Sequence, residues 1–296
     1  MDTVPTTHSI VVGFDGSPAA ESAVDWAATQ AKQRGVGLRV VAAIPWPYNG
    51  IGMGAAAPFD PHQLARDLAA DGQKRALKVL DESDVTVIGH ADNAANALVD
   101  ESESADLVVV GHPSRSRLGQ IFIGSVVYGV VAHSKCDVAV VPDGNVVLPG
   151  PRHPVMVGVD GSDAALKAVD RAAQEAHRWG APLEIVQTWF LSTVTGWSGA
   201  LAGTTIVDED ADFFGKAARE SVAKAAAEAK SLHEDLAVET LVFEEHPARA
   251  LVDTSKKAGL LVVGSRGLGG FERLLLGSVS RYVIQHATVP VLVVRR

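Results

Sequence analysis

The sequence predicts an α/β fold of two tandem doubly wound, Rossmann-like domains, each a five-stranded parallel sheet with helices on both faces. Three observations carry this prediction. The chain has 296 residues, which is the length of roughly two average domains. It contains an internal repeat, and each repeat alternates short β-branched apolar runs with longer amphipathic segments. Apolar residues make up 47% and charged residues 21% of the chain, as in globular rather than disordered or fibrous proteins.

The repeat is visible in short matches that occur in the same order in both halves. IVVGFDGS at 10–17 corresponds to VMVGVDGS at 155–162, LVVVG at 107–111 to LLVVG at 260–264, and IGSV at 123–126 to LGSV at 276–279. These matches define domain 1 as residues 1–144, a linker as 145–154 and domain 2 as 155–296. The prolines and glycine of the linker favour neither helix nor strand.

The elements of domain 1 follow from its apolar patterns. Predicted strands lie at 9–15, 37–44, 84–90, 106–111 and 137–142, and predicted helices at 19–34 and 61–82. The strand residues 107–110 and 138–141 are apolar on both faces, as expected for parallel strands covered by helices. Such sheets bind ligands beyond the carboxyl ends of their strands, so functional residues are expected there.

A glycine-rich loop follows one of these strands in domain 2. Gly264-Ser265-Arg266-Gly267 is followed, after nine intervening residues, by Gly277-Ser278 at the start of a predicted helix. Glycine lets backbone N–H groups approach an anion, and a helix N-terminus adds unpaired N–H groups and partial positive charge. In isolation, turn glycines and a helix N-cap explain these residues better. Their order after a strand and their repetition favour a phosphate site, with a hydroxyl from Ser278 and positive charge from Arg266.

Two aspartates, Asp15 and Asp160, stand at the end of the first predicted strand of each domain. A carboxylate beside a phosphate loop suits a ribose hydroxyl, a base or a metal ion. Capping of the following helix is the structural alternative, and Ser17 and Ser162 are equally suited to that role.

Both halves resemble the universal stress protein family, which has a flavodoxin-like nucleotide-binding fold, and their arrangement is similar to its tandem subgroup. The resemblance covers nearly the whole chain. Its ATP-binding members carry Gly-x2-Gly-x9-Gly-(Ser/Thr), which Gly264, Gly267, Gly277 and Ser278 match. It implies ATP with Mg²⁺ as the ligand, a role in stress or growth-state adaptation, and a residue at the end of the second strand beside adenine. The implied binding residues are Gly13, Asp15, Ala43, Gly111, Ser114, Arg117, Gly124, Ser125 and Val126 in domain 1, and Gly158, Asp160, Thr188, Gly264, Arg266, Gly267, Gly277, Ser278, Val279 and Ser280 in domain 2.

Domain 1 departs from this glycine pattern. It reads Gly111-His112-Pro113-Ser114 before Gly124-Ser125, so serine replaces the second glycine. If that position requires a left-handed backbone, serine costs roughly 1–2 kcal/mol, and Pro113 removes one N–H group. Arg115 and Arg117 supply positive charge that partly compensates. We therefore expect ATP to bind well in domain 2, and more weakly or in a changed pose in domain 1.

Several catalytic patterns are missing from the sequence. It contains no P-loop, no dinucleotide-binding fingerprint and no nucleophile elbow. Because no general base or arginine finger is identifiable, we expect a nucleotide-dependent signalling module rather than an enzyme. Three alternatives stay open: a slow ATPase, a scaffold without nucleotide, and a binder of another adenine nucleotide such as cyclic AMP.

Charge and cysteine content limit the partners and the compartment. The formal net charge of −9 argues against nucleic acids and anionic membranes as partners. The single cysteine, Cys136, fits a structural thiol better than a redox sensor, and no signal peptide is visible, so we expect a cytoplasmic protein.

By the family resemblance, strands 137–142 and 289–295 are expected to pair within the chain, which leaves monomer and homodimer equally open. The sequence identifies neither the stress signal nor a regulatory protein partner.

Overall fold

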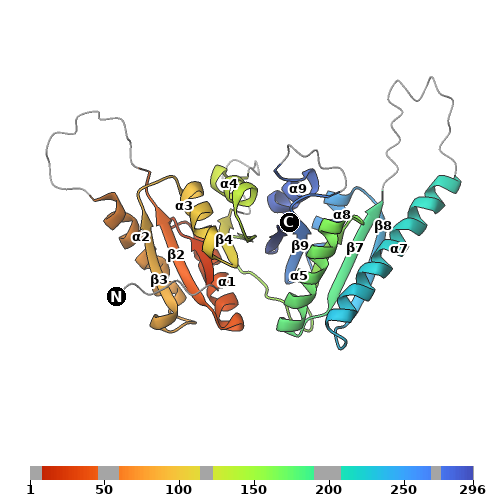
Figure 1. Ribbon diagram of the computed structural model, residues 1–296, viewed down its shortest axis with the longest axis horizontal. Helices are drawn as coiled ribbons and strands as arrows, with labels where there is room; N and C mark the ends of the chain where they lie inside the picture. Colours follow the sequence, from red (N-terminus) through yellow and green to blue (C-terminus); the bar gives the residue numbers. More distant parts are fainter. Residues whose placement is uncertain (1–8, 46–59, 114–122, 190–207, 268–274, 296) are drawn as a thin grey trace, which may run out of the picture. The chain divides into compact units, whose positions relative to one another are not determined.

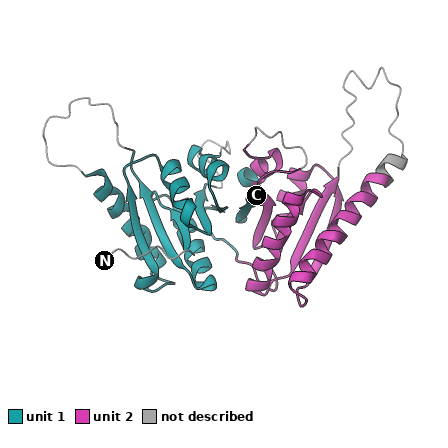
Figure 2. Cartoon of the chain, viewed as in Figure 1, with its two compact units in different colours: residues 1–147, 284–295 teal, residues 148–283, 296 magenta. Residues whose placement is uncertain are grey.

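The computed structural model describes residues 9–45, 60–113, 123–189, 208–267 and 275–295. Contacts divide the chain into two compact units, shown in Figure 2. Unit 1 comprises residues 1–147 and 284–295, and unit 2 comprises residues 148–283.

Unit 1 alternates strands and helices along the chain (Figure 1). Its elements are β1 (Ser9–Gly13), α1 (Pro18–Arg34), β2 (Gly37–Ala43), α2 (Pro61–Ala76), β3 (Val85–His90), α3 (Ala94–Glu101), β4 (Leu107–His112), α4 (Ser125–His133) and β5 (Asp137–Pro142). The strands lie parallel in the order β3-β2-β1-β4-β5. The five parallel strands predicted for domain 1 are therefore confirmed. The strand order reverses between β1 and β4, and sheets of this kind bind ligands at such a point.

Unit 2 repeats this order. Its elements are β6 (Val155–Val159), α5 (Asp163–Trp179), β7 (Leu183–Trp189), α7 (Asp208–Leu232), β8 (Val238–Glu244), α8 (Pro247–Ser255), β9 (Leu260–Gly264) and α9 (Ser278–His286), the last three residues of α9 being grouped with unit 1. The strands lie parallel in the order β8-β7-β6-β9. The order therefore reverses between β6 and β9.

The last strand of the chain, β10 (Val291–Val294), groups with unit 1. It pairs antiparallel with β5, and Val291 lies opposite Val140. The Arg295 main-chain N–H donates to Asp137 Oδ1 (3.0 Å), and its guanidinium donates to two carbonyl oxygens in the last turn of α4 (2.9 Å each). The predicted pairing of the two final strands is confirmed. Residues 284–295 thus belong to the predicted domain 2 by sequence repeat but to unit 1 by contacts. The reason is that these hydrogen bonds join them to β5 and α4 of unit 1.

Both units owe their first helix to the same local signals. Ser17 and Ser162 accept hydrogen bonds from the backbone of Ala20 and Ala165 (3.2 Å each), which satisfies free N–H groups at the starts of α1 and α5. Both helices end at a glycine in the left-handed conformation. Helix α2 ends at Ala76 rather than at the predicted residue 82, because the following residues form tighter turns instead.

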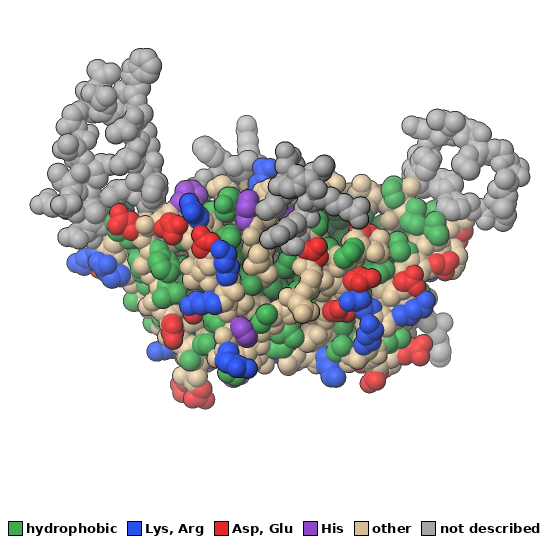
Figure 3. Space-filling view, turned by 180° about the vertical axis from the view of Figure 1, so that it is seen from behind, with side chains coloured by type: hydrophobic (Ala, Val, Ile, Leu, Met, Phe, Trp, Pro, Cys, Tyr) green, Lys and Arg blue, Asp and Glu red, His purple; other side chains and the backbone are tan. Residues whose placement is uncertain are grey.

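The strands form a continuous buried core in each unit. Ile10, Val11 and Val12 of β1 are fully buried although successive side chains point to opposite faces. This burial requires helices on both faces of the sheet, as the unbroken apolar runs predict. On the face shown in Figure 3, acidic and basic side chains lie interspersed over both units. None of the described helices combines the length and the apolar character needed to cross a membrane.

His112 is a buried titratable residue at the end of β4. Its side chain is 2% exposed, and its ring nitrogens make no well-formed hydrogen bond within the described residues. Burial lowers the pKa of His112 below its ordinary value of 6.5; the main chain of Gln285 and the charge of Asp143 oppose this shift, whereas His286 adds to it.

We expect the free energy of unfolding to fall as the pH drops below about 6.5, because the unfolded chain then takes up a proton that folded His112 resists. Denaturant unfolding at pH 7.5 and pH 5.5 measures this difference. The variant His112→Asn should show a smaller pH dependence than the wild type. Equal pH dependence in wild type and His112→Asn would contradict the assignment.

Cys136 is a partly buried thiol between α4 and β5. Burial raises its pKa to about 12, so little thiolate is present at neutral pH. We expect iodoacetamide to leave Cys136 unmodified in the folded protein at pH 8 and to alkylate it in urea, as mass spectrometry would record. Rapid alkylation of the folded protein would instead favour a redox role.

Candidate functional site

A cavity of about 470 Å³ lies at the carboxyl ends of the unit 2 strands, where the strand order reverses. Strand ends of β6, β7 and β9, the start of α8 and the start of α9 form its walls. The lining residues are Gly158, Val159, Asp160, Ala165, Val186, Thr188, Pro247, Leu251, Val263, Gly264, Arg266, Gly267, Leu276, Gly277, Ser278, Val279 and Ser280. All ten residues predicted for domain 2 are among them, so the structure brings these predicted residues together in one cavity.

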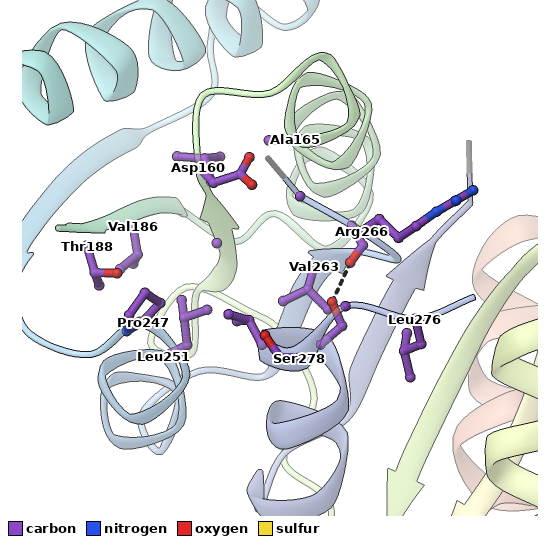
Figure 4. Close-up of a pocket in the computed structure, with 17 residues that line it drawn as sticks. Asp160, Ala165, Val186, Thr188, Pro247, Leu251, Val263, Arg266, Leu276 and Ser278 are labelled. Carbon is purple, nitrogen blue, oxygen red and sulfur yellow. Dashed lines mark hydrogen bonds between the residues drawn. The ribbon is translucent and has the colours of Figure 1, made fainter. Parts of the chain in front are cut away.

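The other seven lining residues were not singled out from the sequence. Figure 4 shows Val186 and Thr188 from β7 close to Pro247 and Leu251 from α8, on the opposite side of the cavity from Arg266. Val186 and Thr188 are two residues apart on one strand and therefore point to the same face. That spacing is the sequence signal that identifies Val186, once Thr188 is assigned to the site.

Asp160 is held at the edge of the cavity by the turn that leads into α5. Its Oδ1 accepts hydrogen bonds from the main-chain N–H of Ser162 (3.0 Å) and from Ser162 Oγ (2.7 Å). Gly161, between them, has a φ of 84°, which glycine adopts without strain. Since Ser162 caps the helix, Asp160 is not needed as the cap, and its carboxylate lies in the cavity lining.

Gly267 is required by the neighbouring carboxylate rather than by its own backbone conformation. Its φ does not lie in the left-handed region. A Cβ atom at this position would overlap Asp160 Oδ2. This loop position therefore does not need glycine for a left-handed backbone, which the sequence analysis considered. It needs glycine because the loop passes so close to Asp160 that a side chain would overlap the carboxylate.

Hydrogen bonds join the loop to the start of α9. Ser280 Oγ donates to the Gly264 carbonyl oxygen (2.7 Å; Figure 4), and the Gly277 N–H donates to the Ser265 carbonyl oxygen (2.9 Å). These bonds place the N-terminus of α9, with Ser278, directly beside the glycine loop. Unpaired N–H groups at such a helix start favour an anion.

The cavity carries little charge of its own. Among the described residues of the lining, only Asp160 and Arg266 are ionisable. The sequence led us to expect that Arg266 brings positive charge into the site. In Figure 4, however, its side chain extends away from Asp160 and Thr188, so the guanidinium does not point toward the cavity centre. The described residues contain no group of three or more His, Cys, Asp or Glu side chains arranged to hold a metal ion.

Unit 1 has a smaller cavity, of about 110 Å³, at the corresponding strand ends. It is lined by Gly13, Phe14, Asp15, Ser17, Ala20, Val41, Ala43, Ala94, Leu98, Val110, Gly111, Val126 and Val127. Five of the residues predicted for domain 1 are therefore in this lining: Gly13, Asp15, Ala43, Gly111 and Val126. Gly124 and Ser125 are described but do not line it. Ser114 and Arg117 lie outside the described residues.

Comparison with known proteins decides the family. The model of the universal stress protein family matches residues 6–142 and again residues 151–295. The chain belongs to the universal stress protein family. The two matched segments coincide with the two halves of the sequence repeat, so this chain is a tandem member.

Relatives match this tandem universal stress protein over its full length. Universal stress protein Rv2623 of Mycobacterium tuberculosis (strain ATCC 25618 / H37Rv) is 35% identical over 309 residues, which cover 100% of this chain and 99% of the relative. Universal stress protein Mb2028c of Mycobacterium bovis is 34% identical and covers 98% of this chain and 97% of the relative. The crystal structure of a universal stress protein from Archaeoglobus fulgidus DSM 4304 covers 97% of this chain and 98% of its own, with a TM-score of 0.61 and 20% identity, and supports the fold.

Proposed function

We propose that this universal stress protein binds an adenine nucleotide, ATP in particular, in the unit 2 cavity and acts as a nucleotide-dependent regulatory module. The observation that carries the proposal is the meeting, in one cavity, of the glycine loop, the N-terminus of α9 and Asp160. Its volume of about 470 Å³ lies within the range of about 300–1,000 Å³ typical of small-molecule sites.

The residues of the cavity fit the two ends of such a ligand. The main chain of the glycine loop and the start of α9, with Ser278, suit phosphate oxygens. Apolar side chains at the other end, among them Val186 and Leu251, suit a base and a sugar. ATP supplies the negative phosphate charge when bound, and Mg²⁺ commonly binds through nucleotide phosphates together with one or two carboxylates. Asp160 is the carboxylate in the lining that would serve this purpose.

We further propose that the nucleotide is held rather than turned over. Among the residues that the structure describes, the lining includes no His, Lys, Cys or Glu, and Oδ1 of Asp160 accepts hydrogen bonds from Ser162. A general base must reach the attacking group with a free acceptor and a suitable pKa. Phosphate release above the buffer rate that disappears in Asp160→Asn would overturn this proposal in favour of a slow ATPase.

The first test is the nucleotide content of the purified protein. The protein is prepared without added nucleotide and denatured, and the released small molecules are identified by chromatography and mass. Calorimetric titrations with ATP, cyclic AMP and GTP follow. We expect ATP to bind more tightly than the other two, with about one equivalent per chain. Absence of both released and titratable adenine nucleotide would favour a scaffold, and preference for cyclic AMP would replace ATP in the proposal.

Regulation requires that ligand binding change an accessible part of the protein. Helix α9 begins at the cavity, and Tyr282 is exposed one turn farther along the helix. We propose that nucleotide occupancy is transmitted through α9 to a cytoplasmic partner. Hydrogen exchange with and without ATP should slow in the first turns of α9, and unchanged exchange there would contradict this route.

A further inference from the structure

Two histidine rings meet where helices α5 and α7 of unit 2 pack against each other. His177 lies in the last turn of α5, and His233 directly follows Leu232, the last residue of α7. The ring centroids are 4.3 Å apart and the ring planes differ by 12°, so the rings are stacked. Neutral rings can stack in this way, but two protonated rings at this distance repel each other.

The surroundings of the pair do not remove this repulsion. The charged residues around it are Glu175 and Arg178 on α5, Lys230 on α7, Glu234 and Asp235 in the turn after α7, and Glu184 of β7. Glu175 is paired with Arg178 (2.9 Å) and Glu184 with Lys257 (2.8 Å). Partial burial, and next the neighbouring His177, lower the pKa of His233 below its ordinary value of 6.5. None of these carboxylates therefore outweighs the second ring.

The matching contact of unit 1, between α1 and α2, is closed by an ion pair instead. Arg75 of α2 donates from Nε and Nη2 to the two carboxylate oxygens of Asp25 (2.6 Å each) and from Nη1 to Glu21 (3.0 Å). The repeat places Lys32 and Leu80 where unit 2 has its two histidines. Because carboxylic acids ordinarily titrate around pH 4 and a guanidinium above about pH 12, an ion pair of this kind persists throughout the histidine range.

At the equivalent place in unit 2, a glutamate replaces the arginine. Glu228 of α7 corresponds to Arg75 in the repeat, and Asp170 of α5 corresponds to Asp25. Burial and the charge of Glu228 raise the pKa of Asp170 above its ordinary value, as expected for two neighbouring carboxylates. The ionic link of unit 1 is thus replaced by a repulsive contact, and the histidine pair contributes more to holding α5 against α7.

We infer that the stacked histidines are an acid-sensitive contact, which holds α5 against α7 at neutral pH and loosens unit 2 when both rings are protonated. The corresponding contact of unit 1 keeps its ion pair over the same pH range. The inference goes beyond nucleotide binding and does not depend on it. Because Ala165, near the start of α5, is in the cavity lining, the sensitive contact belongs to a helix that borders the unit 2 cavity.

Hydrogen exchange of the full chain tests this inference, measured by mass spectrometry at pH 7.5 and pH 5.5 and corrected for the intrinsic exchange rates. Two unit charges 4.3 Å apart in water repel enough to shift a local opening equilibrium about fivefold. We therefore expect the last two turns of α5 and α7 to exchange about fivefold faster at pH 5.5, relative to the change in α1 and α2.

The matched variant is His233→Phe, which keeps an aromatic ring against His177 but takes up no proton. In this variant α5 and α7 should lose their excess exchange at pH 5.5, whereas α1 and α2 should respond as in the wild type. His177→Phe should give the same result, and it replaces the first variant if the thermal midpoint at pH 7.5 shows that one to be unfolded. An NMR titration of the ring protons is an independent readout, because His177→Phe should raise the pKa of His233.

Three results would overturn the inference. Absence of excess exchange in α5 and α7 of the wild type at pH 5.5 would show that their contact stays closed in acid. An excess that persists in folded His233→Phe would assign the response to other groups, such as Asp170 and Glu228. Equal acceleration in all four helices would indicate the general destabilisation expected from His112 rather than a local contact. Each of these results leaves the function proposed for the unit 2 cavity intact.

Discussion

Replacement of Gly267 by valine is expected to weaken ATP binding at least about a hundredfold, or about 2.7 kcal/mol. Even the first atom of the new side chain would overlap Asp160 Oδ2. Either the carboxylate or the loop must then move, and both belong to the cavity lining. Because Gly267 lies at the cavity surface rather than in the core, the substitution should leave the fold intact. Calorimetric titration of the variant with ATP measures the loss.

The matched control for this substitution is Gly124→Val. A Cβ atom at Gly124 meets no atom of another described residue within 4 Å, and Gly124 lines neither cavity. We expect this variant to bind ATP as the wild type does, and both variants to unfold at nearly the wild-type temperature. Wild-type affinity in a folded Gly267→Val protein would refute the assignment of the unit 2 cavity as the ATP site.

Substitution of Gly111 by alanine is expected to have the largest effect on stability. The added Cβ would overlap main-chain atoms of Ala19 and Ala20, which cannot rotate away as a side chain can. Strand β4 and helix α1 would have to separate at the centre of unit 1, at a cost of about 2–4 kcal/mol. For a domain of this size, the unfolding midpoint should fall by several degrees. Thermal and urea unfolding measure the change.

The repeat supplies the control for this prediction. Gly264 is the unit 2 counterpart of Gly111, but a Cβ atom there would be no closer than 3.1 Å to its nearest neighbour, the Arg266 carbonyl oxygen. A small shift of the loop relieves that contact, so Gly264→Ala should destabilise the protein much less. Equal losses of stability in the two variants would disprove the close packing of β4 against α1.

The sequence was sufficient to predict that functional residues lie beyond the carboxyl ends of the strands. It also predicted most of the residues that line the unit 2 cavity. Apolar runs located the five strands of domain 1, and the repeat located their counterparts in domain 2. Glycines and Asp160 were recognisable because their chemistry is unusual at strand ends. Val186 and Leu251 were missed because an apolar residue that lines a cavity has the same local pattern as one that fills the core.

Other features depend on contacts between distant residues and have no local pattern. The close approach of Asp160 to Gly267 joins residues 107 positions apart, so the sequence left the reason for that glycine undecided. The close contact of Gly111 with the main chain of Ala19 depends on the distance between β4 and α1, not on the glycine itself, which the other repeat shares as Gly264. The direction of the Arg266 side chain, away from Asp160 and Thr188 in Figure 4, likewise has no local sequence pattern.

The pairing of β10 with β5 determines when unit 1 can be completed during synthesis. A ribosome produces β5 about 150 residues before β10, since the paired residues Val140 and Val291 are that far apart in the chain. Until the C-terminus emerges, one edge of β5 keeps its main-chain groups without this partner, and unpaired strand edges promote aggregation. Unit 1 begins to be synthesised first but is completed last, and a chain that ends before β10 leaves this unit without its final strand.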